Sequence, residues 1–141
     1  MKHLAYAPAL MVAVPTFAVA ATTPDRGAID RKADEILGHL KAGDAAAVVE
    51  TSIGVSPLMS GKDAEKQSLI SQIQTTFQIY GPVSSVDLAK EVGYGSLVVK
   101  RFYVAQHEKA LTRWQITFIK LPTGWTVVHI AFDDQVPGWA D

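Results

Sequence analysis

The chain has 141 residues, 48% of them hydrophobic, and its 13 Lys and Arg against 14 Asp and Glu give a formal net charge of −1. A near-neutral chain lacks the basic field that nucleic-acid binding generally requires, so no nucleic-acid partner is expected. The absence of Cys excludes disulfides, thiolate catalysis and Cys-ligated metals. This length and hydrophobic content predict a single folded domain.

The first 20 residues have the pattern of a secretory signal peptide. Lys2 precedes an apolar run over 4–14, and the small residues 18–20 form a cleavage site. A buried helix or a membrane anchor is the alternative, but two prolines interrupt the run and it is shorter than the roughly 20 residues a span needs. We expect a signal peptide over 1–20 and a single α+β domain over 21–141, periplasmic or secreted, with no membrane contact after cleavage.

Three helices are predicted at the start of this domain. The first has a cap at Thr23 and Pro24 and Asp25 in its first turn, and it ends near Gly43. Asp44 is a suitable cap for a short second helix. The stretch 53–61 contains Gly and Pro and predicts a loop, whereas 62–80 contains neither and predicts a long third helix. The apolar stripes are Ile29, Ala33, Ile36, Leu37 and Leu40 in the first helix, and Leu69, Ile70, Ile73, Phe77 and Tyr80 in the third.

From Val83 onward the period of the apolar residues changes from helical to alternating. Four strands are predicted, at roughly 83–92, 96–106, 110–121 and 125–133, separated by turn residues. Helices followed by a strand meander are typical of an α+β fold in which N-terminal helices cover one face of an antiparallel sheet.

The last hairpin allows a register to be predicted, because a one-residue slip would move every side chain to the wrong face. With Leu121 and Trp125 flanking the turn, one face is apolar and the other is polar or mixed. The apolar pairs are Trp114 with Phe132, Ile116 with Ile130 and Phe118 with Val128; the others are Arg113 with Asp133, Gln115 with Ala131 and Thr117 with His129.

Alternation does not settle the second strand. Two sets of residues compete for its inward face, namely Val98, Phe102 and Val104 against Leu97, Val99 and Tyr103. A central strand buried on both faces and a strand with a β-bulge both remain open.

Two segments carry a resemblance to a known family. The helix-ending LKAGDAAAV at 40–48, followed by a longer helix and by strands that close with PTGWTVVHI at 122–130, resembles the ketosteroid-isomerase and SnoaL-like superfamily, which shares the nuclear transport factor fold. The resemblance covers nearly all of 21–141 and implies a curved, cone-shaped, cystatin-like sheet with a pocket, and commonly a dimer. Members include isomerases, cyclases, dehydratases, transport factors and exported proteins of unknown role, so the fold does not choose the function.

An isomerase-type site would place carboxylates and a Tyr or acid donor inside the apolar cone. The predicted inward face carries no acid, so no catalytic residue is predicted. Glu35 and His39 lie one helical turn apart, but such a pair is usually a solvated helix face, and we expect neither a metal nor a cofactor.

Alternation places His129 on the face away from the core. That face is either an exposed surface or subunit contact, or an anion or small-ligand site formed by Arg101, Arg113 and His129. The candidate ligand-binding residues are Arg101, Tyr103, Arg113, His129, Tyr80, Trp114 and Phe118.

These observations favour an exported, non-catalytic module that binds a small hydrophobic ligand or a protein through an apolar cone pocket. The alternative is a small isomerase-, dehydratase- or cyclase-like enzyme acting on a hydrophobic substrate. The outer face of the sheet also predicts a homodimer, in which Arg113 or Arg101 would meet Asp133 across the axis. The residues assigned to that interface are Tyr103, Gln115, Thr117, Trp125, Val127 and His129.

Overall fold

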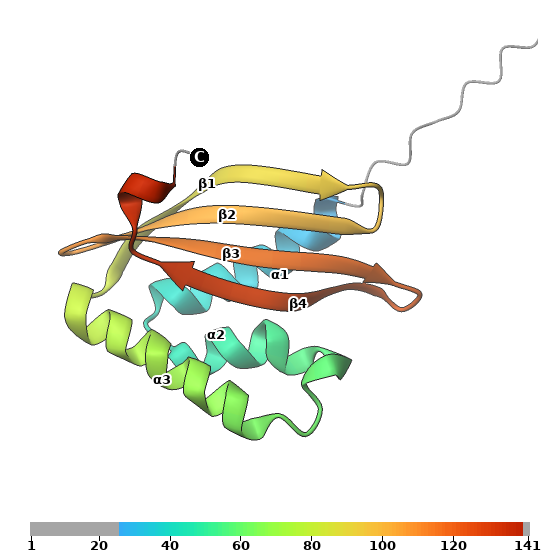
Figure 1. Ribbon diagram of the computed structural model, residues 1–141, viewed down its shortest axis with the longest axis horizontal. Helices are drawn as coiled ribbons and strands as arrows, with labels where there is room; N and C mark the ends of the chain where they lie inside the picture. The colour runs from blue at the N-terminus through green and yellow to red at the C-terminus, as the bar shows by residue number, and fades with distance from the viewer. Residues whose placement is uncertain (1–25, 140–141) are drawn as a thin grey trace, which may run out of the picture.

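The computed structural model describes residues 26–139, which form three helices followed by four strands (Figure 1). The predicted signal peptide lies outside these residues. Across the described part of the chain, no helix is both long enough and apolar enough to cross a membrane. The elements are α1 (Arg26–Lys41), α2 (Ala45–Thr51), η1 (Ile53–Val55), η2 (Pro57–Met59), α3 (Asp63–Tyr80), β1 (Val83–Tyr94), β2 (Val98–His107), β3 (Leu111–Leu121), β4 (Gly124–Asp133) and η3 (Val136–Gly138).

The predicted start of the first helix, at Thr23 and Pro24, lies outside residues 26–139, whereas the other helix boundaries lie close to those that the local sequence predicts. A side-chain oxygen of Asp44 accepts a hydrogen bond from the Ala47 N–H at 3.0 Å, so Asp44 caps α2. Gly43, with φ of 72°, makes the left-handed turn that separates α1 from α2. All five residues of the α1 stripe are buried, while α3 buries Ile70 and Ile73 from its predicted stripe. The predicted loop between α2 and α3 contains the two short 3₁₀ turns η1 and η2.

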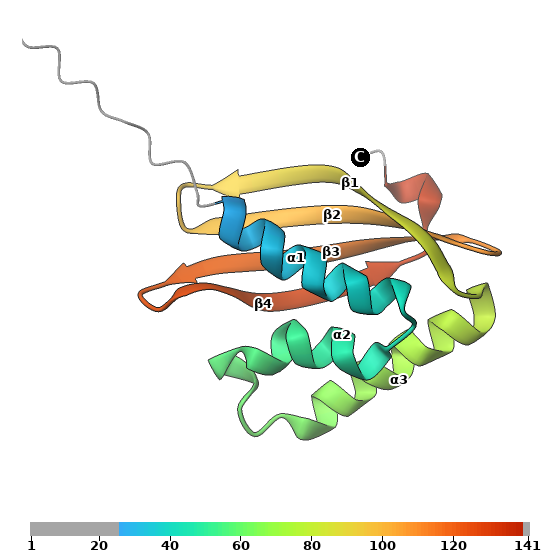
Figure 2. The same ribbon diagram turned by 180° about the vertical axis from the view of Figure 1, so that it is seen from behind.

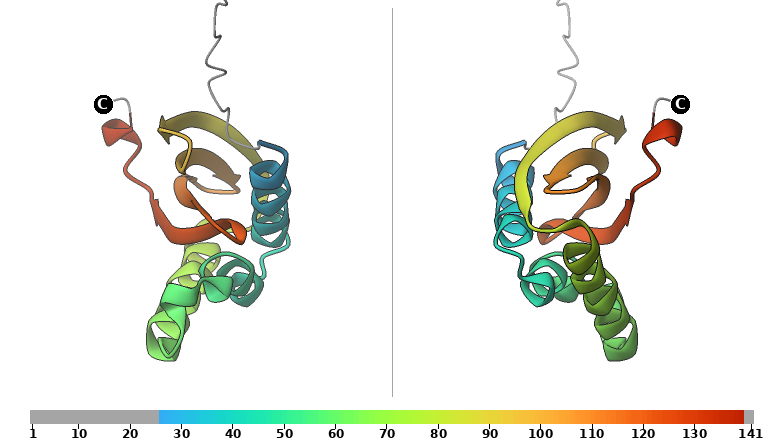
Figure 3. Two further views of the ribbon diagram at one scale, coloured as in Figure 1. Left: turned by 90° about the vertical axis from the view of Figure 1, so that its right-hand side faces the viewer. Right: turned by 90° about the vertical axis from the view of Figure 1, so that its left-hand side faces the viewer.

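The sheet is an antiparallel meander in the order β1–β2–β3–β4, which confirms the α+β class. Figure 2 shows α1 lying across one face of the sheet, and Figure 3 shows the sheet curving toward α1. The long helix α3 instead lies beneath the β4 edge, packed on α2, and its C-terminal end meets the end of β2 through rings of Phe77 and Tyr80 against His107. The strand nearest α3 is therefore β4, one of the two edge strands of the sheet.

Five of the six residue pairs predicted for the last hairpin are observed, and the sixth is wrong. Phe118 pairs with Val127 instead of Val128, because Val128 is an extra residue that forms a β-bulge in β4. The bulge reverses the alternation on its turn side. Trp125 and Val127, predicted to lie on the outer face, are therefore buried in the core.

Strand β2 resolves the alternation that the sequence left open. Its buried residues are Val99, Arg101, Tyr103, Ala105 and His107, and the residues between them are half-buried or exposed. Tyr103 pairs with Trp114 and Arg101 pairs with Ile116, and opposed residues of an antiparallel pair project from the same face. Both side chains therefore face the helices. The prediction that they lie on the outer face is wrong.

Candidate functional site

The seven residues predicted to bind a ligand do not form one site. Arg101, Tyr103, Trp114 and Phe118 are buried on the inner face, whereas Arg113 and His129 are on the outer face and Tyr80 ends α3. Alternation fixes only which residues share a face within one strand. Which face of one strand coincides with which face of its neighbour depends on the register between them. The turn residues alone did not define this register for β2.

Arg101 is a structural cation. Its Nη2 lies 2.7 Å from a carboxylate oxygen of Asp30 on α1, and its Nε lies 2.8 Å from one of Glu91 on β1. Burial alone would lower the pKa of Arg101, but hydrogen bonds with Tyr103, Asp30 and Glu91 outweigh it and raise that pKa. Two carboxylates already occupy the guanidinium, so Arg101 is not available to bind an anion.

Arg113 holds the C-terminal turn against the outer face. Its Nε and Nη2 donate to Oδ2 of Asp133 at 3.1 and 2.9 Å, and its guanidinium lies over the rings of Phe102 and Trp139. Oδ1 of Asp133 accepts from Nε1 of Trp139 at 2.5 Å. Burial opposes ionisation of Asp133, but the hydrogen bonds from Trp139, Gln135 and Arg113 hold the pKa of its carboxyl below the ordinary value. The predicted Arg113–Asp133 contact is thus made within one subunit.

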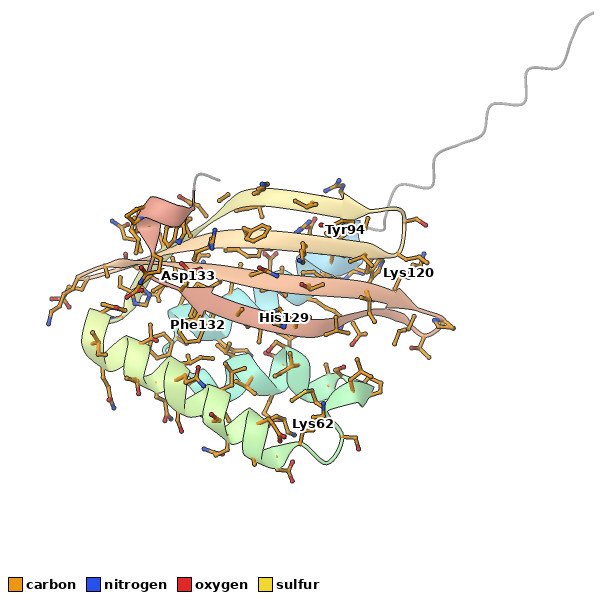
Figure 4. All side chains as sticks on the ribbon, viewed as in Figure 1. Lys62, Tyr94, Lys120, His129, Phe132 and Asp133 are labelled. Atoms are coloured by element: carbon orange, nitrogen blue, oxygen red, sulfur yellow. The ribbon has the colours of Figure 1, made fainter. Side chains whose placement is uncertain are left out.

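A pocket of about 340 Å³ opens where the C-terminal ends of α3 and β4 meet. A shallower hollow of about 430 Å³ continues along α3, and Phe132 lines both. Figure 4 shows the Phe132 side chain between β4 and α3. We call these two hollows together the α3–β4 groove. The pocket is lined by Thr76, Ile79, Tyr80, Thr112, Phe132, Asp133, Asp134 and Gln135, and the hollow by Ser68, Ser71, Gln72, Thr75 and Phe132.

The apolar base of the groove is held by the core beneath it. The Phe132 ring stacks on buried Trp114 with centroids 4.6 Å apart and planes inclined by 21°. Nε1 of Trp114 in turn donates to Oγ1 of Thr112 at 2.8 Å. Trp114, one of the residues predicted to bind a ligand, therefore supports the Phe132 ring from below and does not line the pocket itself.

A chain of hydrogen bonds continues from Thr112 to the end of α3. Nε2 of His107 lies 2.8 Å from Oγ1 of Thr112, and Nδ1 of His107 lies 2.9 Å from the carbonyl oxygen of Gly81. A carbonyl oxygen only accepts, so Nδ1 carries a proton. In the neutral ring Nε2 then accepts from the Thr112 hydroxyl, whose oxygen accepts from Trp114. The ring nitrogens of His107, the Thr112 hydroxyl and Nε1 of Trp114 therefore all have partners.

The rim of the pocket carries negative charge. The Tyr80 hydroxyl donates to Oδ2 of Asp134, and Nε2 of Gln135 donates to Oδ1 at 2.7 Å. These bonds lower the pKa of the Asp134 carboxyl, and the bond to Asp134 raises the pKa of Tyr80. Among residues 26–139, no Lys, Arg or His forms an ion pair with Asp134.

Sequence reasoning found Tyr80 but missed most of the pocket. Phe132 was assigned to the core, and the position of Asp133 and Asp134 against α3, at the end of β4 and directly after it, depends on tertiary packing. One signal was present: α3 carries small polar residues at helical spacing, including Ser68, Ser71 and Thr75, in place of the Lys and Glu of a solvated face. In the described ranges, His, Asp and Glu form no group able to hold a metal ion.

No family profile and no curated protein matches this chain. Solved structures do match it. An NTF2-like protein of unknown function from Shewanella baltica covers 77% of this chain and 92% of its own, with 14% identity and a TM-score of 0.52. A DUF4783 family protein from Bacteroides uniformis covers 72% and 95%, with 14% identity and a TM-score of 0.51. The chain therefore has the NTF2-like α+β fold, the nuclear transport factor fold of the superfamily that its sequence resembles.

Proposed function

We propose that this protein is a non-catalytic binding module that takes a small hydrophobic ligand in the α3–β4 groove. The observation that carries the proposal is the Phe132 ring at the base of an open pocket, fixed from below by Trp114. A volume of about 340 Å³ is within the range of small-molecule sites, which combine an apolar base with a few polar groups at the rim. Export to the periplasm or the exterior is part of this proposal.

The state of the acids supports binding over catalysis. A carboxyl that serves as a general acid or base near neutral pH needs a pKa raised by apolar surroundings. Asp133 and Asp134 instead have lowered pKa values, and Asp134 is exposed. Among the described residues no Asp or Glu is buried on the inner face of the sheet, where Trp114, Ile116 and Phe118 pack and the buried cation Arg101 is already paired.

A small isomerase-, dehydratase- or cyclase-like enzyme is the second candidate. The observation in its favour is the hydrogen bond between the Tyr80 hydroxyl and Asp134, a donor and an acid at the mouth of an apolar pocket. Recovery of a bound ligand chemically unchanged after long incubation supports the binding module. Conversion of that ligand, lost in Tyr80→Phe, supports the enzyme.

The binding proposal is tested with the neutral fluorescent dye N-phenyl-1-naphthylamine. Phe132→Ala removes the apolar base, and Ser71→Trp fills the hollow without removing any core side chain. Both variants should weaken dye binding by about tenfold, Phe132→Ala because the dye loses an aromatic contact and Ser71→Trp because the added ring occupies the hollow. Circular dichroism checks that each variant is folded.

Tyr94→Ala is the matched control for the loss of an aromatic ring. Tyr94 is 59% exposed at the far end of β1 and lines none of the groove (Figure 4). Its removal should leave dye binding unchanged. Equal dye affinity in the unmodified protein and in folded Phe132→Ala and Ser71→Trp would show that the groove is not the binding site.

A further inference from the structure

We infer that the ligand of the α3–β4 groove is an amphipathic organic cation, an ammonium group attached to a small apolar body. The inference rests on the proposed function, because it names the chemical class that the same groove would select. Three observations carry it: the hydroxyl donors of the pocket are already engaged, an anionic acceptor is left over, and aromatic residues line the same pocket as that acceptor.

The hydroxyl donors that line the pocket are engaged by protein acceptors. The Tyr80 hydroxyl donates to Asp134, the Thr76 hydroxyl donates to the Gln72 carbonyl at 3.0 Å, and the Thr112 hydroxyl donates to the neutral ring of His107. A hydroxyl has only one proton to donate. Gln135 is the lining side chain that keeps an N–H, since one of its two protons goes to Asp134. A ligand rich in acceptors therefore finds few side-chain donors in the pocket.

Acceptor capacity, by contrast, remains. A carboxylate has about four acceptor sites, and Asp134 uses two of them, one for Tyr80 and one for Gln135. Its neighbour Asp133 is neutralised by Arg113 at 2.9 Å, but Asp134 has no cationic partner in residues 26–139. The lowered pKa keeps Asp134 ionised at neutral pH. The complementary group is a positively charged donor.

The surroundings of Asp134 suit an ammonium group that carries an apolar body. The rings of Phe132 and Tyr80 and the side chain of Ile79 line the same pocket as Asp134. Aromatic faces attract cations, and the apolar surface accommodates the rest of the molecule.

The test uses three probes of one shape and different charge: 2-phenylethylamine, 2-phenylethanol and 3-phenylpropionate. Isothermal titration of the purified protein near neutral pH should give an affinity for the amine about tenfold above that for the alcohol, with the propionate weakest. The preference for the amine should fall at high salt, because the pair with Asp134 is exposed.

Two variants locate the preference. Asp134→Asn keeps the shape and the acceptor for Tyr80 but removes the charge, so the amine should bind no more tightly than the alcohol. Asp87→Asn makes the same change on an exposed carboxylate of β1 that lines none of the groove, and the preference should remain. Circular dichroism confirms that both variants are folded.

The outcomes separate the ligand class from the binding function. Equal affinities for amine and alcohol, both lost in Phe132→Ala, would overturn the cation inference and leave the groove as a binding site. A preference for the amine that survives Asp134→Asn would also overturn it. Failure of every probe to bind, or binding that is insensitive to Phe132→Ala, would overturn the proposed function together with the inference.

Discussion

Nε2 of His107 lies 2.8 Å from Oγ1 of Thr112, and this contact joins the last residue of β2 to the second residue of β3 beneath the pocket. Both side chains are buried, so neither can replace its partner with bulk water. The contact therefore supports the Trp114 and Phe132 rings and fixes the end of α3 through the carbonyl of Gly81.

Thr112→Val should lower the free energy of unfolding by about 2–4 kcal/mol, because it leaves Nε2 of His107 and Nε1 of Trp114 without partners at nearly constant volume. Urea denaturation measures the change. Thr126→Val, on a half-buried residue of the outer face, is the matched control and should stay within about 0.5 kcal/mol. Equal effects of the two substitutions would contradict a structural role for the buried chain.

Arg101→Met should cost about 3 kcal/mol of unfolding free energy, because it leaves Glu91 and Asp30 without their buried cation. The loss of unfolding free energy should not be larger, because Arg26 also pairs with Glu91 and still compensates part of its charge. Arg113→Met, which removes a more exposed ion pair, should cost about 1 kcal/mol. Chemical denaturation of the two variants gives the comparison, and a larger loss in Arg113→Met would contradict the assignment of Arg101.

The pH dependence of stability should carry a contribution from Asp133. Its folded-state pKa is lowered from 3.8, so the unfolded chain takes up the proton first, and the stabilisation is present above about 3.8. It is lost as pH falls through the lower pKa of the folded state. Between about pH 5 and pH 3, Asp133→Asn should therefore lose less of its Tm than the unmodified protein. Parallel Tm curves would show that the carboxylate contributes nothing.

We expect the protein to form a homodimer through the outer face of its sheet. Among the described residues the three helices lie away from this face, and only η3 and Trp139 cover part of it (Figure 3). Of the predicted interface, Gln115, Thr117 and His129 are on the outer face, and half-buried Phe102 and Ile119 join them. The same face also carries Lys100 opposite Thr117 and the Arg113–Asp133 ion pair, and its mixture of aromatic, β-branched and polar groups is typical of interfaces.

Gln115→Lys places like charges near the two-fold axis and should weaken association without unfolding the subunit. Analytical ultracentrifugation measures the association, and Gln74→Lys on the exposed face of α3 is the matched control. The expectation fails when the unmodified protein sediments as a monomer at high concentration.

Export predicts cleavage between Ala20 and Ala21 when the full chain is produced in a bacterium with a secretion pathway. Mass spectrometry of the periplasmic fraction should give the mass of residues 21–141. An exported product that retains Met1 would contradict the signal peptide.

The elements could be predicted because their signals are local. Gly43 and Asp44 end one helix and begin the next, and Gly81 ends α3, so each boundary is encoded within a few residues. The pocket could not be predicted in the same way. It depends on how far α3 lies from β4, and on the stacking of Phe132 on Trp114 across two strands. Neither relation leaves a periodic signal in the sequence.

The β-bulge at Val128 has a consequence for comparing this chain with its structural neighbours. Before the bulge the odd-numbered residues of β4 face the core, and after it the even-numbered residues do. A related protein whose hairpin lacks the extra residue would match this chain only if the alignment placed a gap inside β4, where gaps are normally penalised. An alignment forced to remain gapless would match buried positions such as Trp125 and Val127 with solvent-facing ones, and similarity over the core would be hidden.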